Sequence, residues 1–88
     1  MRLLVLYRPK SEHSRMTEDF IKNYQRVNPQ DSLEIIDVDS REGIATLSLY
    51  DVTDYPAILV LSSDGSAQNI WQGIQLPLID EVAGYSRN

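Results

Sequence analysis

The run of apolar residues at positions 3–7, Leu-Leu-Val-Leu-Tyr, constrains the fold more than any other feature of this 88-residue sequence. Polar and apolar residues do not alternate in it, and it ends at Arg8 and Pro9. A short continuous apolar run is typical of a β-strand covered on both faces, because a strand with one solvated face alternates. The run therefore predicts a central strand in a sheet that carries helices on both sides.

The segment that follows has the periodicity of an amphipathic helix. Ser11 is suited to begin it, because the hydroxyl of an N-cap serine accepts a hydrogen bond from a free backbone N–H. Asn28 precedes Pro29 and ends it, because the residue before a proline disfavours helical backbone angles. Between them, apolar residues three or four positions apart form one stripe, which comprises Met16, Phe20, Ile21, Tyr24 and Val27.

A second strand and a second helix come next. Residues 33–38 are rich in branched side chains and predict a strand. Asp39 or Ser40 then caps a helix that should end near residue 49 or 50, with Glu42 placed for a capping box. Gly43 weakens this helix. The buried edge that we predict for it comprises Ile44 and Leu47.

The last third of the sequence predicts a hairpin and a closing helix. Strands are expected at 57–61 and 67–71, joined by the turn sequence Ser-Asp-Gly-Ser at 63–66. Pro77 suits the first turn of a helix that runs to about residue 85. The residues of this helix that should face inward are Leu78, Ile79 and Val82.

The predicted order of elements is therefore βαβαββα. We expect an α/β fold in which a four-stranded mixed sheet is flanked by three helices, forming a three-layer sandwich. A connection between the first two strands, if they are parallel neighbours, should be right-handed. We expect one domain over residues 1–88, since a chain of this size supports one modest core.

The composition argues against several classes of partner. The net charge is −5 and the isoelectric point is about 4.6, whereas binding to nucleic acid or to an anionic membrane needs clustered cations. No stretch approaches the roughly 20 apolar residues that span a bilayer. The apolar run at 3–7 is shorter than the core of a signal peptide, so we expect a cytoplasmic location. We also expect a monomer.

We predict neither a metal nor a cofactor. The sequence has one histidine and no cysteine, so it lacks a ligand set for structural zinc. Four aspartates could attract a weakly held cation, but they lack the spacing of a calcium loop. We interpret Asp37, Asp39, Asp51 and Asp54 as solvated carboxylates near strand and helix ends.

Two stretches resemble the thioredoxin and glutaredoxin family. Residues 4–14, Leu-Val-Leu-Tyr-Arg-Pro-Lys-Ser-Glu-His-Ser, are similar to the strand and loop that deliver the family's CxxC motif to a helix N-terminus. Residues 50–61, Tyr-Asp-Val-Thr-Asp-Tyr-Pro-Ala-Ile-Leu-Val-Leu, resemble the segment that contains the family's cis-proline and third core strand. The resemblance implies the thioredoxin-like fold and a cis bond between Tyr55 and Pro56, although only about 5–6% of X–Pro bonds are cis.

The sequence departs from the family where the chemistry takes place. The resemblance aligns the CxxC motif with Ser11-Glu12-His13-Ser14, and the chain contains no cysteine. Disulfide exchange needs a thiolate that attacks a sulfur atom, and a serine hydroxyl cannot form the mixed disulfide. We therefore expect a redox-inactive chain that is not an enzyme of dithiol chemistry.

The resemblance also indicates where a ligand would bind. In the family, the backbone before the cis-proline accepts an extended peptide or glutathione as an added strand, and a helix N-terminus lies beside it. In this sequence that site would comprise the degenerate motif of Ser11, Glu12, His13 and Ser14 together with Tyr7, Asp54, Tyr55 and Pro56.

Three functions remain open. The first is a non-catalytic adaptor domain that binds a protein segment. The second is a glutathione-binding domain in which Ser11 would activate the thiol of the small ligand, since a donated hydrogen bond favours a thiolate. The third is a Cys-to-Ser variant of a thiol–disulfide oxidoreductase.

Overall fold

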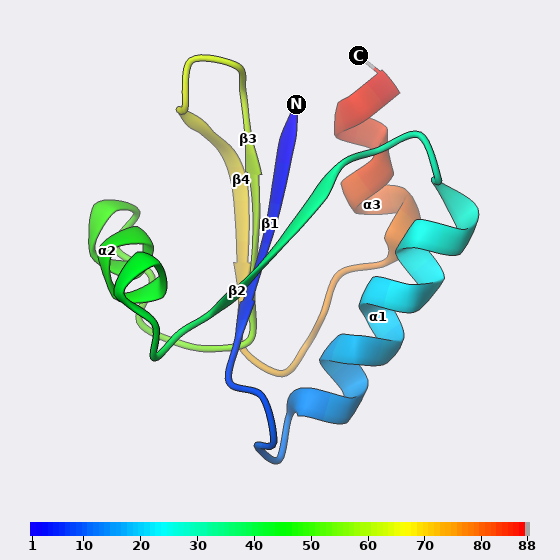
Figure 1. The fold of residues 1–88 in the computed structure, drawn as a ribbon. Helices are drawn as coiled ribbons and strands as arrows, with labels where there is room; N and C mark the ends of the chain where they lie inside the picture. The colour runs from blue at the N-terminus through cyan, green and yellow to red at the C-terminus, as the bar shows by residue number, and fades with distance from the viewer. Residues whose placement is uncertain (88) are drawn as a thin grey trace.

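Four strands form one sheet in the order β2-β1-β3-β4, in a computed structural model that describes residues 1–87 (Figure 1). The central strand β1 (Arg2–Tyr7) pairs in parallel with β2 (Leu33–Asp37) and antiparallel with β3 (Ala57–Leu61). β3 pairs antiparallel with β4 (Ala67–Gln72), as expected for a hairpin. The predicted mixed sheet of four strands is confirmed.

Helices cover both faces of this sheet. α1 (Ser14–Val27) and the short α3 (Ile79–Ala83) lie against one face, and a 3-10 turn (Gly84–Arg87) follows α3. α2 (Arg41–Leu49) lies against the opposite face (Figure 1). The predicted βαβαββα order and the three-layer arrangement are confirmed.

The core is divided by the sheet into two clusters, and β1 supplies side chains to both. Leu3, Val5 and Tyr7 point toward α1 and α3, whereas Leu4 and Leu6 point toward the side of α2. The same alternation holds along β3, and every residue of β3 is buried. The continuous apolar sequence of these strands is thus explained by helices on both faces.

The first helix begins later than predicted. His13 rather than Ser11 occupies the N-cap position of α1, and no side chain accepts a capping hydrogen bond there. The chain uses residues 8–13 to turn away from β1, with Lys10 at a positive φ of 62°. Val27 is 48% exposed, so its predicted place in the buried stripe is also wrong.

The second helix is capped by Ser40, one of the two predicted residues, but it packs on a different side. The predicted capping box with Glu42 is wrong, because Gly43 rather than Glu42 stands three residues after Ser40. The hydroxyl of Ser40 accepts a hydrogen bond from the backbone N–H of Gly43 at 2.9 Å. Gly43 approaches the end of β2 so closely that a Cβ atom on it would lie 2.0 Å from the carbonyl oxygen of Asp37. Because α2 rests on its glycine, Ile44 points outward and is 61% exposed, which corrects the prediction that it is buried.

The last helix is shorter than predicted. Pro77 is buried but precedes the helix, and Leu78 is the N-cap residue of α3 and is 70% exposed. The carboxylate of Glu81 accepts a hydrogen bond from the backbone N–H of Leu78 at 2.9 Å, which fixes the first turn. Only Ile79 and Val82 of the three predicted inward-facing residues pack on the core.

Candidate functional site

The loop between β1 and α1 is closed by the hydroxyl groups of its two serines. Ser11 Oγ donates a hydrogen bond to the carbonyl oxygen of Arg8 at 2.5 Å, and Ser14 Oγ donates to the carbonyl oxygen of Ser11 at 2.8 Å. Both hydroxyl protons are therefore engaged by main-chain acceptors. In this conformation the serines stabilise a turn and donate to no other group.

His13 and Tyr7 lie together beside this turn. The backbone N–H of Arg8 donates to Nε2 of His13 at 3.1 Å, so the other ring nitrogen is the one available as a donor. The rings of Tyr7 and His13 meet edge to face with their centroids 6.3 Å apart. The phenol of Tyr7 donates to Glu18 at 2.8 Å, and burial together with this carboxylate raises the pKa of Tyr7.

Arg8 connects the serine turn to the segment around Tyr55. Its guanidinium group pairs with Asp39 at 2.8 and 3.1 Å and lies 5.3 Å from the centroid of the Tyr55 ring. Hydrogen bonding to Arg8 lowers the pKa of Asp39, and the same contact raises the pKa of Arg8. Arg8 is not among the predicted site residues, because nothing in its local sequence indicates these partners.

The loop before β3 is held by its own polar groups. The peptide bond between Tyr55 and Pro56 is cis. The carboxylate of Asp54 accepts a hydrogen bond from the N–H of Tyr55 at 2.9 Å, and the carbonyl of Pro56 accepts from Gly73 at 2.9 Å. Gln72 also accepts from the backbone N–H of Asp54 at 3.2 Å. The main-chain donor of Tyr55 is thus already occupied by Asp54.

An open pocket lies at the start of α1. It has a volume of about 350 Å³ and is lined by Glu12, His13, Met16 and Ile74. Ile74 follows β4, is 72% exposed, and comes directly after Gly73, which has a positive φ of 94°. Met16 is predicted only as part of the helical stripe, and Ile74 is not among the predicted site residues, because their proximity arises only in the folded chain.

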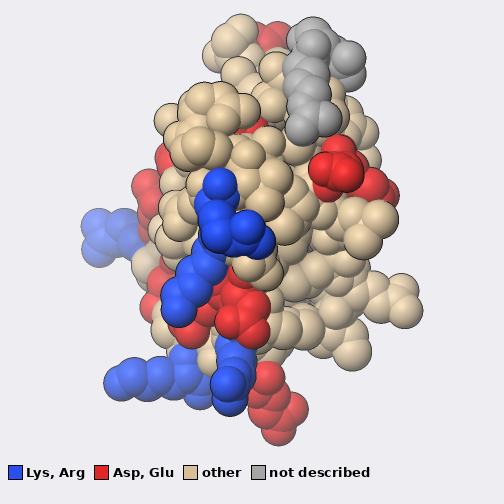
Figure 2. Space-filling model, turned by 90° about the vertical axis from the view of Figure 1, so that its right-hand side faces the viewer, with Lys and Arg blue, Asp and Glu red and all other residues tan. Residues whose placement is uncertain are grey.

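The charges around the site are mixed. Figure 2 looks onto the side covered by α1 and shows a band of Lys and Arg side chains with Asp and Glu side chains among and beside them. No group of three or more potential metal ligands occurs within residues 1–87. Over the same residues, no helix has the length and apolar character needed to cross a membrane.

The structure therefore gathers most of the predicted site residues into two linked parts. Tyr7, Ser11 and His13 form the part at the β1–α1 turn, and Asp54 to Pro56 form the part before β3. Arg8 joins them by its contacts with His13, Ser11 and Tyr55. Glu12 lies outside this network and lines the neighbouring pocket.

Comparison with known proteins establishes the fold. No family model matches the chain, and no curated protein matches it by sequence. Thioredoxin 1 from the thermophilic eubacterium Thermosipho africanus TCF52B superposes with a TM-score of 0.71 at 15% identity, over 99% of this chain and 92% of that one. A structure concerned with the thiol resolving mechanism in yeast mitochondrial 1-Cys peroxiredoxin via glutathione/thioredoxin systems superposes with a TM-score of 0.68 at 16% identity, over 98% of this chain and 73% of that one. The chain has a thioredoxin-like fold.

Proposed function

We propose that this chain is a redox-inactive thioredoxin-like domain that binds an extended segment of another protein. The segment would lie between the turn of residues 11–14 and the loop of residues 54–56, with an apolar side chain in the pocket beside Ile74. The single observation that carries the proposal is that both serine hydroxyls donate to main-chain carbonyls while a pocket lined in part by apolar side chains remains open beside them.

The chemistry of the turn supports a binding role rather than a thiol-exchange role. We interpret Ser11 and Ser14 as standing where the family's two cysteines would be, and a hydroxyl forms no mixed disulfide. In the observed conformation these hydroxyls close the turn. Ser11 and Ser14 would therefore fix the conformation of the turn that borders the proposed binding surface.

The exposed apolar groups support an apolar contact. Ile74 is 72% exposed, and Met16 lies next to it in the pocket. Covering an isoleucine side chain contributes about 1.5–3 kcal/mol, which is enough to make one such contact important for a short peptide. Tyr55 adds a half-buried aromatic ring at the other end of the face.

The carboxylate of Asp54 would compete with the bound peptide for the backbone N–H of Tyr55. Its carboxylate occupies the N–H of Tyr55, which is the main-chain group that an added strand would use. An incoming segment must displace this carboxylate and offer its own carbonyl oxygen. Asp54→Ala should therefore strengthen peptide binding, because the competing acceptor is removed.

The glutathione alternative is less well supported. Activation of a bound thiol requires Ser11 to donate its proton to sulfur, yet that proton is engaged by the carbonyl of Arg8 at 2.5 Å. A bound thiolate would have to break this hydrogen bond and reopen the turn. We therefore rank peptide binding above glutathione binding.

Selection from a displayed library of random heptapeptides tests the proposal. Enriched peptides would be titrated into the isotope-labelled chain, and we expect amide shifts at Met16, Tyr55 and Ile74. Titration with reduced glutathione in a parallel sample should leave these amides unshifted.

A matched pair of variants serves as the control. Ile74→Ser should weaken binding of the selected peptides by roughly tenfold. Leu78→Ser removes a side chain of nearly equal exposure, 70% against 72%, away from the pocket lining and should bind normally. Equal binding by both variants, or a library without enriched sequences, would contradict the proposal.

A further inference from the structure

The outer edge of β2 is open. Within residues 1–87, β1 is the only strand that pairs with β2, and no other segment crosses in front of it in Figure 1. The register between β1 and β2 is regular over all five residues of β2. This edge therefore has the geometry to accept another strand.

The hydrogen-bonding groups of this edge can be assigned from the observed pairing. The N–H of Val38 donates to the carbonyl of Tyr7 at 3.1 Å, so Val38 points its main-chain groups toward β1. Successive residues of a strand in a parallel pair point these groups alternately toward and away from the neighbour. The main-chain groups of Leu33 and Ile35, and the N–H of Asp37, therefore point outward.

The opposite edge of the sheet differs from β2. β4 carries an irregularity in its pairing with β3 near Leu61. The side chain of Asn69 accepts a hydrogen bond from the N–H of Ile70 at 2.8 Å and donates to Tyr85 at 2.9 Å. Bulges and self-satisfied main-chain groups protect sheet edges, whereas β2 contains no bulge, proline or lysine.

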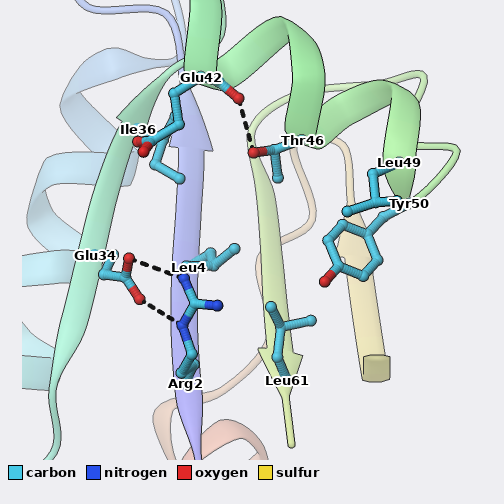
Figure 3. Close-up of a pocket in the computed structure, with 9 residues that line it drawn as sticks. All are labelled: Arg2, Leu4, Glu34, Ile36, Glu42, Thr46, Leu49, Tyr50 and Leu61. Atoms are coloured by element: carbon cyan, nitrogen blue, oxygen red, sulfur yellow. Dashed lines mark hydrogen bonds and ion pairs between the residues drawn. The ribbon is translucent and has the colours of Figure 1, made fainter. Parts of the chain in front are cut away.

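The side chains along β2 define what could pair with it. Ile35 pairs with Val5, so it lies on the side of α1, and it is 52% exposed. Glu34 lies on the side of α2, and Figure 3 shows it with Glu42 beside the small pocket between α2 and the sheet. Asp37 pairs with Tyr7, so its carboxylate lies on the same side as Ile35, at the end of the strand. The side of Ile35 is thus apolar up to Asp37, and the side of α2 carries Glu34 and Glu42.

The charge around this edge is negative. Residues 31–42 contain five carboxylates and one cation, Arg41. Arg2 pairs with Glu34 at 3.0 Å, and Arg8 pairs with Asp39 at 2.8 Å. Three carboxylates remain. Asp31 accepts a hydrogen bond from the hydroxyl of Tyr24 at 2.7 Å, and no ion pair within residues 1–87 involves Asp37 or Glu42.

We propose that β2 accepts an extended basic segment of a partner protein as a fifth strand. Side chains that alternate along this segment would place an apolar residue beside Ile35 and Lys or Arg residues on the side of α2. There one cation would pair with Glu42, and another would share the carboxylate of Glu34 with Arg2. The alternation follows from the period of two in a β-strand. This surface is separate from the turn of residues 11–14, so the inference does not depend on the function proposed above.

The probe for this surface is the blocked peptide Ac-Lys-Val-Lys-Val-Lys-NH2, with Ac-Glu-Val-Glu-Val-Glu-NH2 as its charge-reversed counterpart. We expect the lysine peptide to shift the amides of Leu33, Ile35 and Asp37 and to slow hydrogen exchange at Ile35 and Asp37. Binding should weaken between about 50 mM and about 500 mM salt, because exposed charges are screened. The glutamate peptide should not bind.

Ile35→Lys blocks the edge and should weaken binding of the lysine peptide by roughly tenfold or more. Ile44→Lys adds the same charge at a residue of similar exposure on α2 and should bind normally. Hydrogen exchange of the wild-type chain gives a readout that does not depend on how either variant folds.

Several results would overturn the proposal. Equal binding of the two peptides would show that the negative charge around β2 does not select the partner. Amide shifts at Tyr55 and Ile74 instead of β2 would show that the peptide binds beside the turn of residues 11–14. Self-association of the free chain that is abolished by Ile35→Lys would show that a second copy occupies the edge. Absence of any shift at millimolar lysine peptide would also reject it.

Discussion

Gly43→Ala provides a quantitative test of how α2 is placed on the sheet. The added Cβ atom would lie 2.0 Å from the carbonyl oxygen of Asp37 and 3.0 Å from the Cα atom of Val38. These are main-chain atoms at the end of β2, so no side-chain rotation can relieve the overlap. Either α2 or the end of β2 must move.

Two opposing effects determine the size of the change. Alanine is better than glycine inside a helix by about 1 kcal/mol, which favours the variant. Overpacking a buried contact costs about 1–3 kcal/mol, and a main-chain overlap this close belongs at the upper end of that range. We therefore expect a net loss of about 2 kcal/mol, which corresponds to a melting temperature lower by roughly 8–16 °C in a domain of this size.

Thermal unfolding followed by circular dichroism measures this change, and Gly84→Ala is the matched control. Gly84 has helical angles, φ −56° and ψ −29°, and a Cβ atom there would meet nothing within 4 Å. This control should therefore gain about 0.4–1 kcal/mol. If Gly43→Ala melts at or above the wild-type temperature, or if the two variants shift in the same direction, the close approach of Gly43 to Asp37 does not limit the stability of the chain.

Three further changes test the site and its surroundings. The double variant Ser11→Cys/Ser14→Cys should catalyse the reduction of insulin disulfides in the presence of a reductant, whereas each single variant should have much lower activity. Equal inactivity of all three variants would contradict the proposed equivalence with the CxxC motif. Hydrogen bonds from Ser62 and Ser66 lower the pKa of Asp64 to about 2, so their contribution to stability is complete above about pH 4 and is lost as the pH falls toward 2. Melting curves of Asp64→Asn should accordingly fall less steeply across that range than those of the wild type, and parallel curves would speak against it. Burial and Glu18 raise the pKa of Tyr7, so the contribution of its phenol to stability is present below about pH 10 and is lost as the pH rises through the higher pKa of the folded state. The melting temperature of Tyr7→Phe should therefore fall less than that of the wild type as the pH is raised above about 10.

The central part of the fold could be predicted from sequence because local and tertiary preferences agree there. The bounds predicted for β3 match those observed, since every residue of that strand is apolar and buried. Ser40 likewise caps α2 through a hydrogen bond from Gly43, which is only three residues away in the sequence. Such features depend on neighbours in the chain, which the sequence displays directly.

The errors arise where the sequence permits more than one contact and the folded chain decides which of them forms. The periodicity of a nine-residue helix could not reveal that Gly43 rather than Ile44 faces the sheet, because the deciding neighbour is the carbonyl of Asp37. Ser11 was predicted to cap α1, but its hydroxyl donates to the loop that enters the helix. For the same reason the site was found only in outline, since the contacts of Arg8 with Asp39 and Tyr55 join three separate parts of the chain.

The division of the core by β1 and β3 has a consequence for how the chain opens. Each of these strands supplies side chains to both clusters, so neither cluster can lose its packing while the other stays intact. We expect the amides of the two central strands to exchange with solvent deuterium only through global unfolding. The outer strands β2 and β4 lie at the margins of the sheet, so their amides should exchange through smaller openings at lower free energy.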